Sequence, residues 1–199
     1  MAEDDKFATQ KTEILNQQVQ RTFRVQVNFE ESIMTRFISF LRFTEFDENI
    51  AYLYQLKGAW QQRTKQRPDD SDEPEPTSYW NADDIPAISK QNERRVWQRI
   101  KSMAEDYLGR YPTTLEEDLQ ILANDNPEYT NLTFNTRNCT LFRSGEKEIL
   151  TFLISMADYV LNVLEMKFKD AKKHTQTLPP NMESCRDYLQ THVVRLLAS

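Results

Sequence analysis

The chain has 199 residues, a net charge of −6 and hydrophobic side chains at 39% of its positions, which suits one folded domain over residues 1–199. No apolar run approaches the ~20 residues of a membrane span, and the acidic start MAEDDKFATQ is unlike a signal peptide, so we expect a nuclear or cytosolic protein without a membrane segment. Cys139 and Cys185 form no CxxC pair and are predicted to be reduced, buried thiols.

Three helices are predicted in the first 65 residues. The first covers residues 8–18, with Ile14 and Leu15 turned inward. Asn28 and Glu31 can cap a second helix, and Thr44 and Asp47 can cap a third. The apolar positions of the second and third helices are Ile33, Met34, Phe37, Ile38 and Leu41, then Phe46, Ile50, Leu53, Tyr54 and Trp60.

One strand is predicted between the first two helices. Phe23, Val25, Val27 and Phe29 alternate with polar residues, which places them on one face. No second strand is evident. The free edge either pairs within the domain or accepts a strand from another chain, which makes Phe23, Val25 and Val27 candidate partner-binding residues.

Residues 68–89 are predicted to form a long loop. They contain seven carboxylates, no Lys or Arg and four prolines, a composition that buries too little apolar area to fold alone. Without residues 68–89 the net charge of the chain is about +1, so binding of nucleic acid through its phosphates has little support. The adjacent Tyr79 and Trp80 either anchor a partner protein or fold back on their own domain.

The centre of the chain is predicted to form a helix from Asn92 to Leu108, a short capped helix and one long helix. Gly109 and Pro112 end the first of these, and Thr113 or Thr114 with Glu116 or Glu117 caps the second. The short helix is expected to bury Leu115, Leu119 and Leu122. The long helix is expected to run from Thr133 to Leu164, roughly 50 Å at 1.5 Å per residue, along an apolar stripe that includes Phe134, Leu141 and Phe142.

Basic residues occur in two groups. Arg94, Arg95, Arg99 and Lys101 are expected to form a solvated face, because Glu93, Glu105 and Asp106 on the same helix dilute their charge. The lysines from Lys167 to Lys173 are expected to complement a helix C-terminus. A last helix is predicted over residues 181–198. Its apolar face contains Met182, Cys185, Leu189, Val193 and Leu196, of which Met182, Leu189 and Val193 are further candidate partner-binding residues.

Several of these segments resemble a known family. PTTLEED, followed by FRSGEKEIL, is similar to the C-terminal substrate-binding domain of the Rubisco large-subunit methyltransferase family, whose lysine and actin-histidine methyltransferases carry this helical lobe after a SET domain. Asn92, Glu93 and Trp97 fit the same pattern, as do KFATQKTEIL and SIMTRFISFLRFTEFDE. The resemblance covers most of residues 6–165, and GEKEIL is its most specific part. Ser144 and the inserted NDNPEYTN depart from the pattern.

The residues needed for catalysis are not found. A SET enzyme needs an Asn-His pair and glycine-bearing turns beside S-adenosylmethionine, whereas His174 and His192 follow Lys173 and Thr191, and the only glycines, at positions 58, 109 and 145, are scattered. No Cys or His has metal-ligand spacing. The acids Glu116, Glu117 and Asp118 are expected to complement the helix dipole rather than to act as a catalytic pair. We expect no catalytic residue, no cofactor and no metal.

The expected fold is all-α, an irregular helical bundle around one long helix, with at most the short isolated strand. The leading functional hypothesis is a non-catalytic scaffolding subunit that binds a protein partner, a methyltransferase subunit, with weak or absent direct nucleic-acid binding. The first alternative is the substrate-binding lobe of a SET methyltransferase whose catalytic domain is missing or supplied in trans. The second is a nucleic-acid-binding module.

Overall fold

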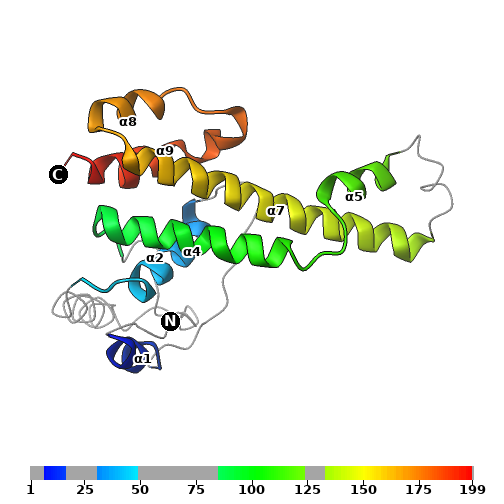
Figure 1. Cartoon of the computed structure of the whole chain (residues 1–199), viewed down its shortest axis with the longest axis horizontal. Coiled ribbons are helices and arrows are strands. Elements are labelled where there is room, and N and C mark those ends of the chain that lie inside the picture. Colours follow the sequence, from blue (N-terminus) through cyan, green and yellow to red (C-terminus); the bar gives the residue numbers. More distant parts are fainter. Residues whose placement is uncertain (1–6, 17–30, 49–84, 124–132, 199) are drawn as a thin grey trace, which may run out of the picture. The chain divides into compact units, whose positions relative to one another are not determined.

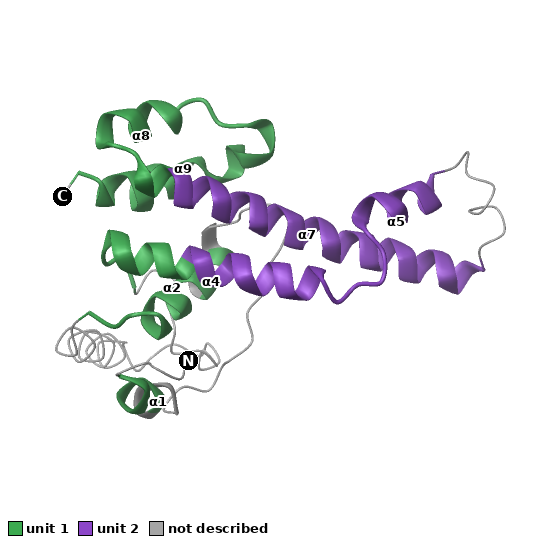
Figure 2. Ribbon diagram, viewed as in Figure 1, with its two compact units in different colours: residues 1–25, 29–96, 163–199 green, residues 26–28, 97–162 purple. Residues whose placement is uncertain are grey.

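A computed structural model describes residues 7–16, 31–48, 85–123 and 133–198, and the regular elements in these ranges are all helical (Figure 1). This confirms the all-α class. The chain divides into two compact units, residues 1–25, 29–96 and 163–199 in unit 1 and residues 26–28 and 97–162 in unit 2 (Figure 2). Helices α4 (Lys90–Leu108) and α7 (Phe134–Glu165) each contribute to both units. The predicted strand and the candidate residues Phe23, Val25, Val27, Tyr79 and Trp80 lie outside the described residues.

Unit 1 begins with helices α1 (Ala8–Asn16) and α2 (Glu31–Thr44). On α2, Met34, Ile38 and Leu41 are buried, as their helical spacing predicts. The Lys11 ammonium group on α1 donates to the Thr44 carbonyl oxygen at the end of α2, with 2.6 Å between nitrogen and oxygen. That bond joins the two helices and satisfies one of the carbonyls that a helix end leaves without an intrahelical partner.

A hydrophobic cluster, mostly of aromatic side chains, forms the core around the C-terminal end of α2. Phe43, Phe46 and Ile85 are buried together, and Phe7, Phe40 and Ile88 pack against them. Ile85 and Ile88 belong to the stretch predicted as an acidic loop. The last residues of that stretch therefore join the hydrophobic core just before α4 begins.

Helix α4 buries the predicted stripe of Val96, Trp97, Ile100 and Ala104. Tyr107 was expected on the same stripe, but 52% of its surface is exposed. Tyr107 stands one residue before the end of α4 at Leu108. The Tyr107 ring instead packs beneath the Arg110 guanidinium at the surface, 4.6 Å from the ring centroid.

Helix α5 (Leu115–Leu122) begins with a complete capping box, and of the alternatives the structure selects Thr114 and Glu117. The Glu117 amide donates to Thr114 Oγ1 at 3.1 Å, and the Thr114 amide donates to Glu117 Oε2 at 2.7 Å. The predicted leucine face is wrong at Leu119, which is 46% exposed. Asp118 is buried instead, because basic side chains on α7 form ion pairs with it.

Helix α7 spans 32 residues, about 48 Å, and confirms the predicted long helix. Its C-terminal half buries the predicted stripe, which includes Leu153, Met156, Val160 and Val163. Its N-terminal half differs from expectation, since Phe134, Leu141 and Phe142 are exposed. Cys139, expected to be buried, is also exposed.

The C-terminal region of unit 1 contains α8 (Phe168–His174), the 3-10 segment η2 (Pro180–Cys185), α9 (Arg186–Tyr188) and the π-helical segment η3 (Leu189–Val194). The predicted single helix is therefore divided, although the predicted apolar residues Met182, Cys185, Leu189 and Val193 are buried. Arg186 Nη1 donates to the carbonyl oxygen of Gln176 at 2.8 Å, which ties α9 to the chain after α8.

Candidate functional site

A fully buried ion pair lies in unit 1. Arg42 on α2 and Glu93 on α4 both have 0% side-chain exposure, and Arg42 donates from Nε to Glu93 Oε2 at 2.8 Å and from Nη2 to Oε1 at 3.0 Å. Tyr188 on α9 donates its hydroxyl to Glu93 Oε1 and accepts a bond from Arg42 Nη2 at 3.2 Å. Arg42 Nη1 donates to the Ile85 carbonyl oxygen at 2.9 Å. The cluster therefore joins α2, α4, α9 and the segment before α4.

The partners of Arg42 in this cluster stabilise its charged form. Burial by itself would lower the pKa of Arg42, but the charge and hydrogen bonds of Glu93, with a contribution from Tyr188, outweigh burial and raise that pKa. Both carboxylate oxygens of Glu93 accept bonds from these partners, and neither Arg42 nor Glu93 is exposed to solvent. The arrangement can position helices. Because its groups are already paired and shielded from water, it is poorly suited to proton transfer.

A second buried cluster lies in unit 2. Lys147 on α7 and Asp118 on α5 have 0% side-chain exposure, and Lys147 Nζ lies 2.6 Å from Asp118 Oδ2. The same ammonium group donates to Thr113 Oγ1 at 2.8 Å and lies within hydrogen-bond reach of the carbonyl oxygens of Thr113 and Thr114. Arg143, one turn earlier on α7, donates from Nε to Asp118 Oδ2 at 2.8 Å.

This second cluster holds α5 against α7. The hydrogen bonds from Arg143 lower the pKa of Asp118 well below its ordinary value; burial opposes that shift, and the bonds from Lys147 and Thr113 add to it. Asp118 is therefore ionised at neutral pH and pairs with both Arg143 and Lys147. Tyr111 completes the arrangement, since Lys147 Nζ lies 5.2 Å from its ring centroid.

The two clusters contain residues of the family-like motifs. Thr113, Thr114 and Asp118 belong to PTTLEED, Lys147 to GEKEIL and Glu93 to the Asn92–Glu93 start of α4. Sequence reasoning singled out these motifs but did not predict the contacts, and it placed Glu93 on a solvated face. Arg42 and Tyr188 were missed entirely. A signal for Arg42 existed, since it stands inside the otherwise apolar run Phe40–Phe43, where a charge must be paired if it is buried.

The candidate partner-binding residues near the C-terminus are buried inside unit 1. Met182 is 3% exposed, Leu189 is 1% exposed and Val193 is 0% exposed. In this conformation they contribute to the core of their own unit. A partner could reach them only if the segment left that core.

An uncovered apolar surface lies on α7. Phe134 is 75% exposed, Phe142 is 71% exposed and Leu141 is 51% exposed. At 3.6 residues per turn, Phe134 and Leu141 lie within about 20° of the direction of Phe152 and Phe142 lies about 80° from it, on the side that the C-terminal half of the helix buries. We call Phe134, Leu141 and Phe142 the open face of α7.

The open face results from the length of α4. Lys101 Nζ on α4 lies 2.6 Å from Asp158 Oδ1 on α7, which places the unit 2 part of α4 beside the C-terminal half of α7 (Figure 1). In this antiparallel pairing α4 ends at Leu108, opposite roughly residue 151 of α7. Helix α5 contacts a different face of α7, through Arg143 and Lys147. Neither helix covers the three side chains.

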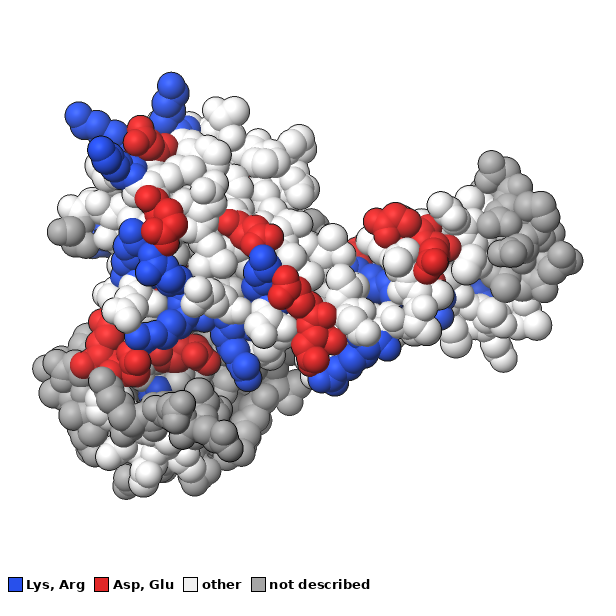
Figure 3. Space-filling model, in the orientation of Figure 1, with Lys and Arg blue, Asp and Glu red and all other residues white. Residues whose placement is uncertain are grey.

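Most basic residues of α4 are paired with acids. Arg94 contacts Glu165, Arg95 contacts Asp47 and Lys101 contacts Asp158. In Figure 3 blue and red side chains alternate along this helix, whereas blue side chains gather over α8. The face that sequence analysis considered for nucleic acid is thus a set of ion pairs, most of them partly exposed, so each contributes little to stability.

The described residues contain neither a membrane-spanning helix nor a metal-binding group. None of their helices is both long enough and apolar enough to cross a membrane. Within the same ranges, no three His, Cys, Asp or Glu side chains are grouped so that they could hold a metal ion.

The chain matches the model of a protein family. The family model described as Rubisco LSMT substrate-binding matches residues 2–150, three quarters of the chain. The match includes α1, α2, α4, α5 and the N-terminal half of α7, and therefore Arg42, Glu93, Asp118 and Lys147. Searches of curated proteins and of solved structures gave no match. The chain belongs to the Rubisco LSMT substrate-binding family.

Proposed function

We propose that this chain is a non-catalytic protein-interaction subunit of a methyltransferase assembly, located in the nucleus or cytosol, and that the open face of α7 is its docking surface. The substrate of that assembly is a protein or a nucleic acid. The observation that carries the proposal is an uncovered apolar stripe within the matched part of a substrate-binding family.

The position of the open face supports a role in binding. Large side chains exposed about two turns apart on one helix resemble the anchors of helix-mediated protein interfaces, where buried aromatic residues supply much of the binding energy. The Asp118–Lys147 cluster holds α5 on another side of the same stretch of α7. The open face is therefore presented on a fixed support, which lowers the entropy lost on binding.

The alternative, a substrate-binding lobe that works with a SET domain, is favoured by the same family match. The two hypotheses differ in what binds the open face. A lobe contacts the methylated substrate, whereas an accessory subunit contacts another subunit of the enzyme. Identification of the protein that crosslinks to this face distinguishes them.

The experiment places a photoreactive phenylalanine analogue at Phe142 in the tagged full chain, expressed in its native cells. We expect a crosslink to a methyltransferase subunit. The chain carrying Phe134→Ser and Phe142→Ser should recover that subunit about tenfold less efficiently, a loss of about 1.4 kcal/mol of binding free energy. Because both side chains are exposed, the thermal unfolding of this double variant should match that of the wild type.

Tyr107→Ser is the matched control, since Tyr107 is an exposed aromatic residue of unit 2 outside the open face. It should leave recovery of the subunit unchanged. Unchanged recovery with the double serine variant would refute the docking surface. A crosslink only to proteins that the chain's assembly methylates would favour the SET-lobe alternative.

The non-catalytic part of the proposal has its own measurement. Isothermal titration of S-adenosylmethionine into the purified chain should give no saturable heat. Saturable binding at micromolar concentration would overturn this part of the proposal.

A further inference from the structure

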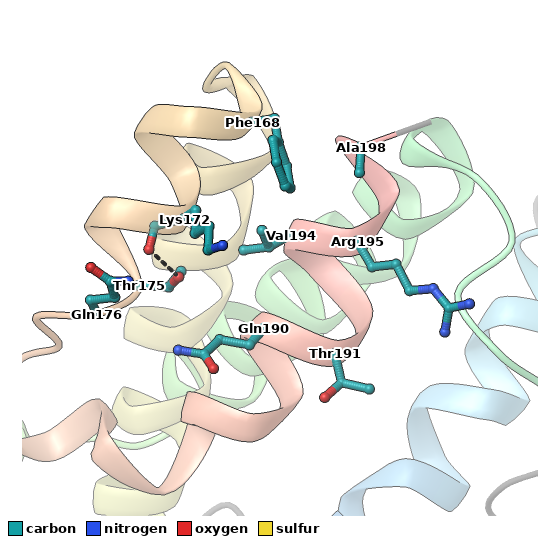
Figure 4. Close-up of a pocket in the computed structure, with 9 residues that line it drawn as sticks. All are labelled: Phe168, Lys172, Thr175, Gln176, Gln190, Thr191, Val194, Arg195 and Ala198. Atoms are coloured by element: carbon teal, nitrogen blue, oxygen red, sulfur yellow. Dashed lines mark hydrogen bonds between the residues drawn. The ribbon is translucent and has the colours of Figure 1, made fainter.

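A groove lies in unit 1 between α8 and the last helical segment, outside the matched residues 2–150. Its volume is about 380 Å³, at the lower end of the range for ligand pockets. Phe168 and Val194 are turned toward each other across it, and Ala198 lies at its end (Figure 4). The groove therefore has an apolar floor that can take one or two side chains.

The groove is also polar at its rim. The Lys172 side chain extends across it toward Val194, while Gln176 and Gln190 lie at one end and Arg195 extends on the far side of the last helix (Figure 4). The glutamine amides offer both hydrogen-bond donors and acceptors. A peptide backbone needs both kinds of partner, whereas a phosphate needs donors only.

The charge around the groove is positive in an acidic chain. Residues 166–198 contain six Lys or Arg and three Asp or Glu, against a net charge of −6 for the whole chain. Arg94, Arg95 and Lys101 of α4 are paired with acids, but Lys172 and Arg195 have no carboxylate partner among the described residues. The same holds for Lys167, just before α8, and for Lys169 and Lys173 within it.

The backbone beside the groove is unusual. Gln190, Thr191 and Val194 belong to the π-helical segment η3, a rare form that occurs often at functional sites. It keeps Leu189 and Val193 in the core while Gln190 and Thr191 line the groove. Its position at the groove is a second observation pointing to binding.

From these features we propose that the α8 groove, formed by Phe168, Lys172, Gln176, Gln190, Val194 and Arg195, binds an acidic peptide segment of a partner protein. One apolar side chain of the peptide occupies the floor, a neighbouring carboxylate pairs with Lys172, and the glutamines bind its backbone. The other α8 lysines attract the segment over longer range. This site is separate in sequence from the open face of α7 and does not depend on it.

The test is a selection of short peptides from a random display library on the immobilised full chain, with the Lys172→Glu chain as counter-selection. We expect enrichment of peptides that carry Leu, Phe or another large apolar residue beside Asp or Glu. For an enriched peptide, Lys172→Glu should weaken binding by about tenfold or more, measured by fluorescence anisotropy.

Lys173→Glu is the matched control, because it reverses the same charge on the same helix outside the groove lining. It should weaken binding by no more than about threefold, through the longer-range field alone. Phe168→Ser should weaken binding, and the open-face variant Phe134→Ser with Phe142→Ser should not. That last result separates this proposal from the proposed function.

Four outcomes would overturn the proposal. They are a selection without enrichment, enriched peptides without acidic residues, equal losses from Lys172→Glu and Lys173→Glu, and Lys172-dependent binding of a DNA oligonucleotide or of phosphatidylserine vesicles that is tighter than binding of the peptide. The last would assign the groove to a polyanion or a lipid surface instead.

Discussion

The buried pair of Arg42 and Glu93 gives the sharpest test of the fold. Glu93→Gln keeps the shape of the side chain but removes its charge. It leaves the Arg42 guanidinium, with 0% exposure, without its counterion. Breaking a buried pair in this way costs about 3–5 kcal/mol, a large part of a typical folding free energy of about 5–15 kcal/mol.

The assay is urea unfolding followed by circular dichroism and by tryptophan fluorescence. With an m-value of about 2 kcal/mol/M, the midpoint should fall by about 2 M. Arg95→Met is the control, since it breaks the partly exposed pair of Arg95 with Asp47 and should cost no more than about 1 kcal/mol.

A double-mutant cycle isolates the interaction. Arg42→Met alone leaves the Glu93 charge unpaired and should cost as much as the single change at Glu93. The chain with Arg42→Met and Glu93→Gln removes both charges and should be clearly more stable than the sum of the two losses predicts. If Glu93→Gln costs no more than Arg95→Met, or if the two losses simply add, the buried pair is not formed as described.

Three further predictions concern pH, packing and thiol reactivity. The pKa of Asp118 is depressed in the folded chain, so the stability that its charge contributes is present above the unfolded pKa of about 3.9 and is lost as pH falls toward the folded pKa. The loss of unfolding free energy caused by Asp118→Asn, measured in urea, should therefore be constant from about pH 5 to 7 and shrink below about pH 4. A loss that does not depend on pH would contradict the assignment. Leu153→Ala removes a side chain that is 6% exposed and should cost about 2–5 kcal/mol in the same assay, whereas an unchanged midpoint would show that this face of α7 is not packed. Burial raises the pKa of the Cys185 thiol to about 11, while Cys139 is exposed. A disulfide reagent should therefore modify only Cys139 in the native chain and both thiols in urea. Rapid modification of both thiols without urea would refute the burial of Cys185.

The helices themselves followed from local sequence. Apolar spacing along α2, α4 and α7, together with the Thr114–Glu117 capping box, predicted these elements within a few residues, because both signals act over one or two turns. The motifs PTTLEED and GEKEIL indicated the family that the comparison then showed.

Prediction from local sequence was wrong where the burial of a side chain depends on a distant segment of the same chain. The leucine spacing of α5 predicted that Leu119 faces inward. Asp118 is buried instead, because Arg143 and Lys147 donate hydrogen bonds to its carboxylate. The stripe of α7 predicted burial along its whole length. Its N-terminal half is open because α4 ends before reaching it, a fact of helix length and register that periodicity does not contain.

The sequence by itself thus determined which segments are helical and which family they belong to. Only the tertiary structure decided which charges are internal. Arg42 meets Glu93 across 51 positions and Tyr188 across 146 positions of the chain. A charged side chain can be buried only where a counterion and hydrogen-bond partners are present. Partners that are so far apart in sequence are brought together only by the packing of whole helices.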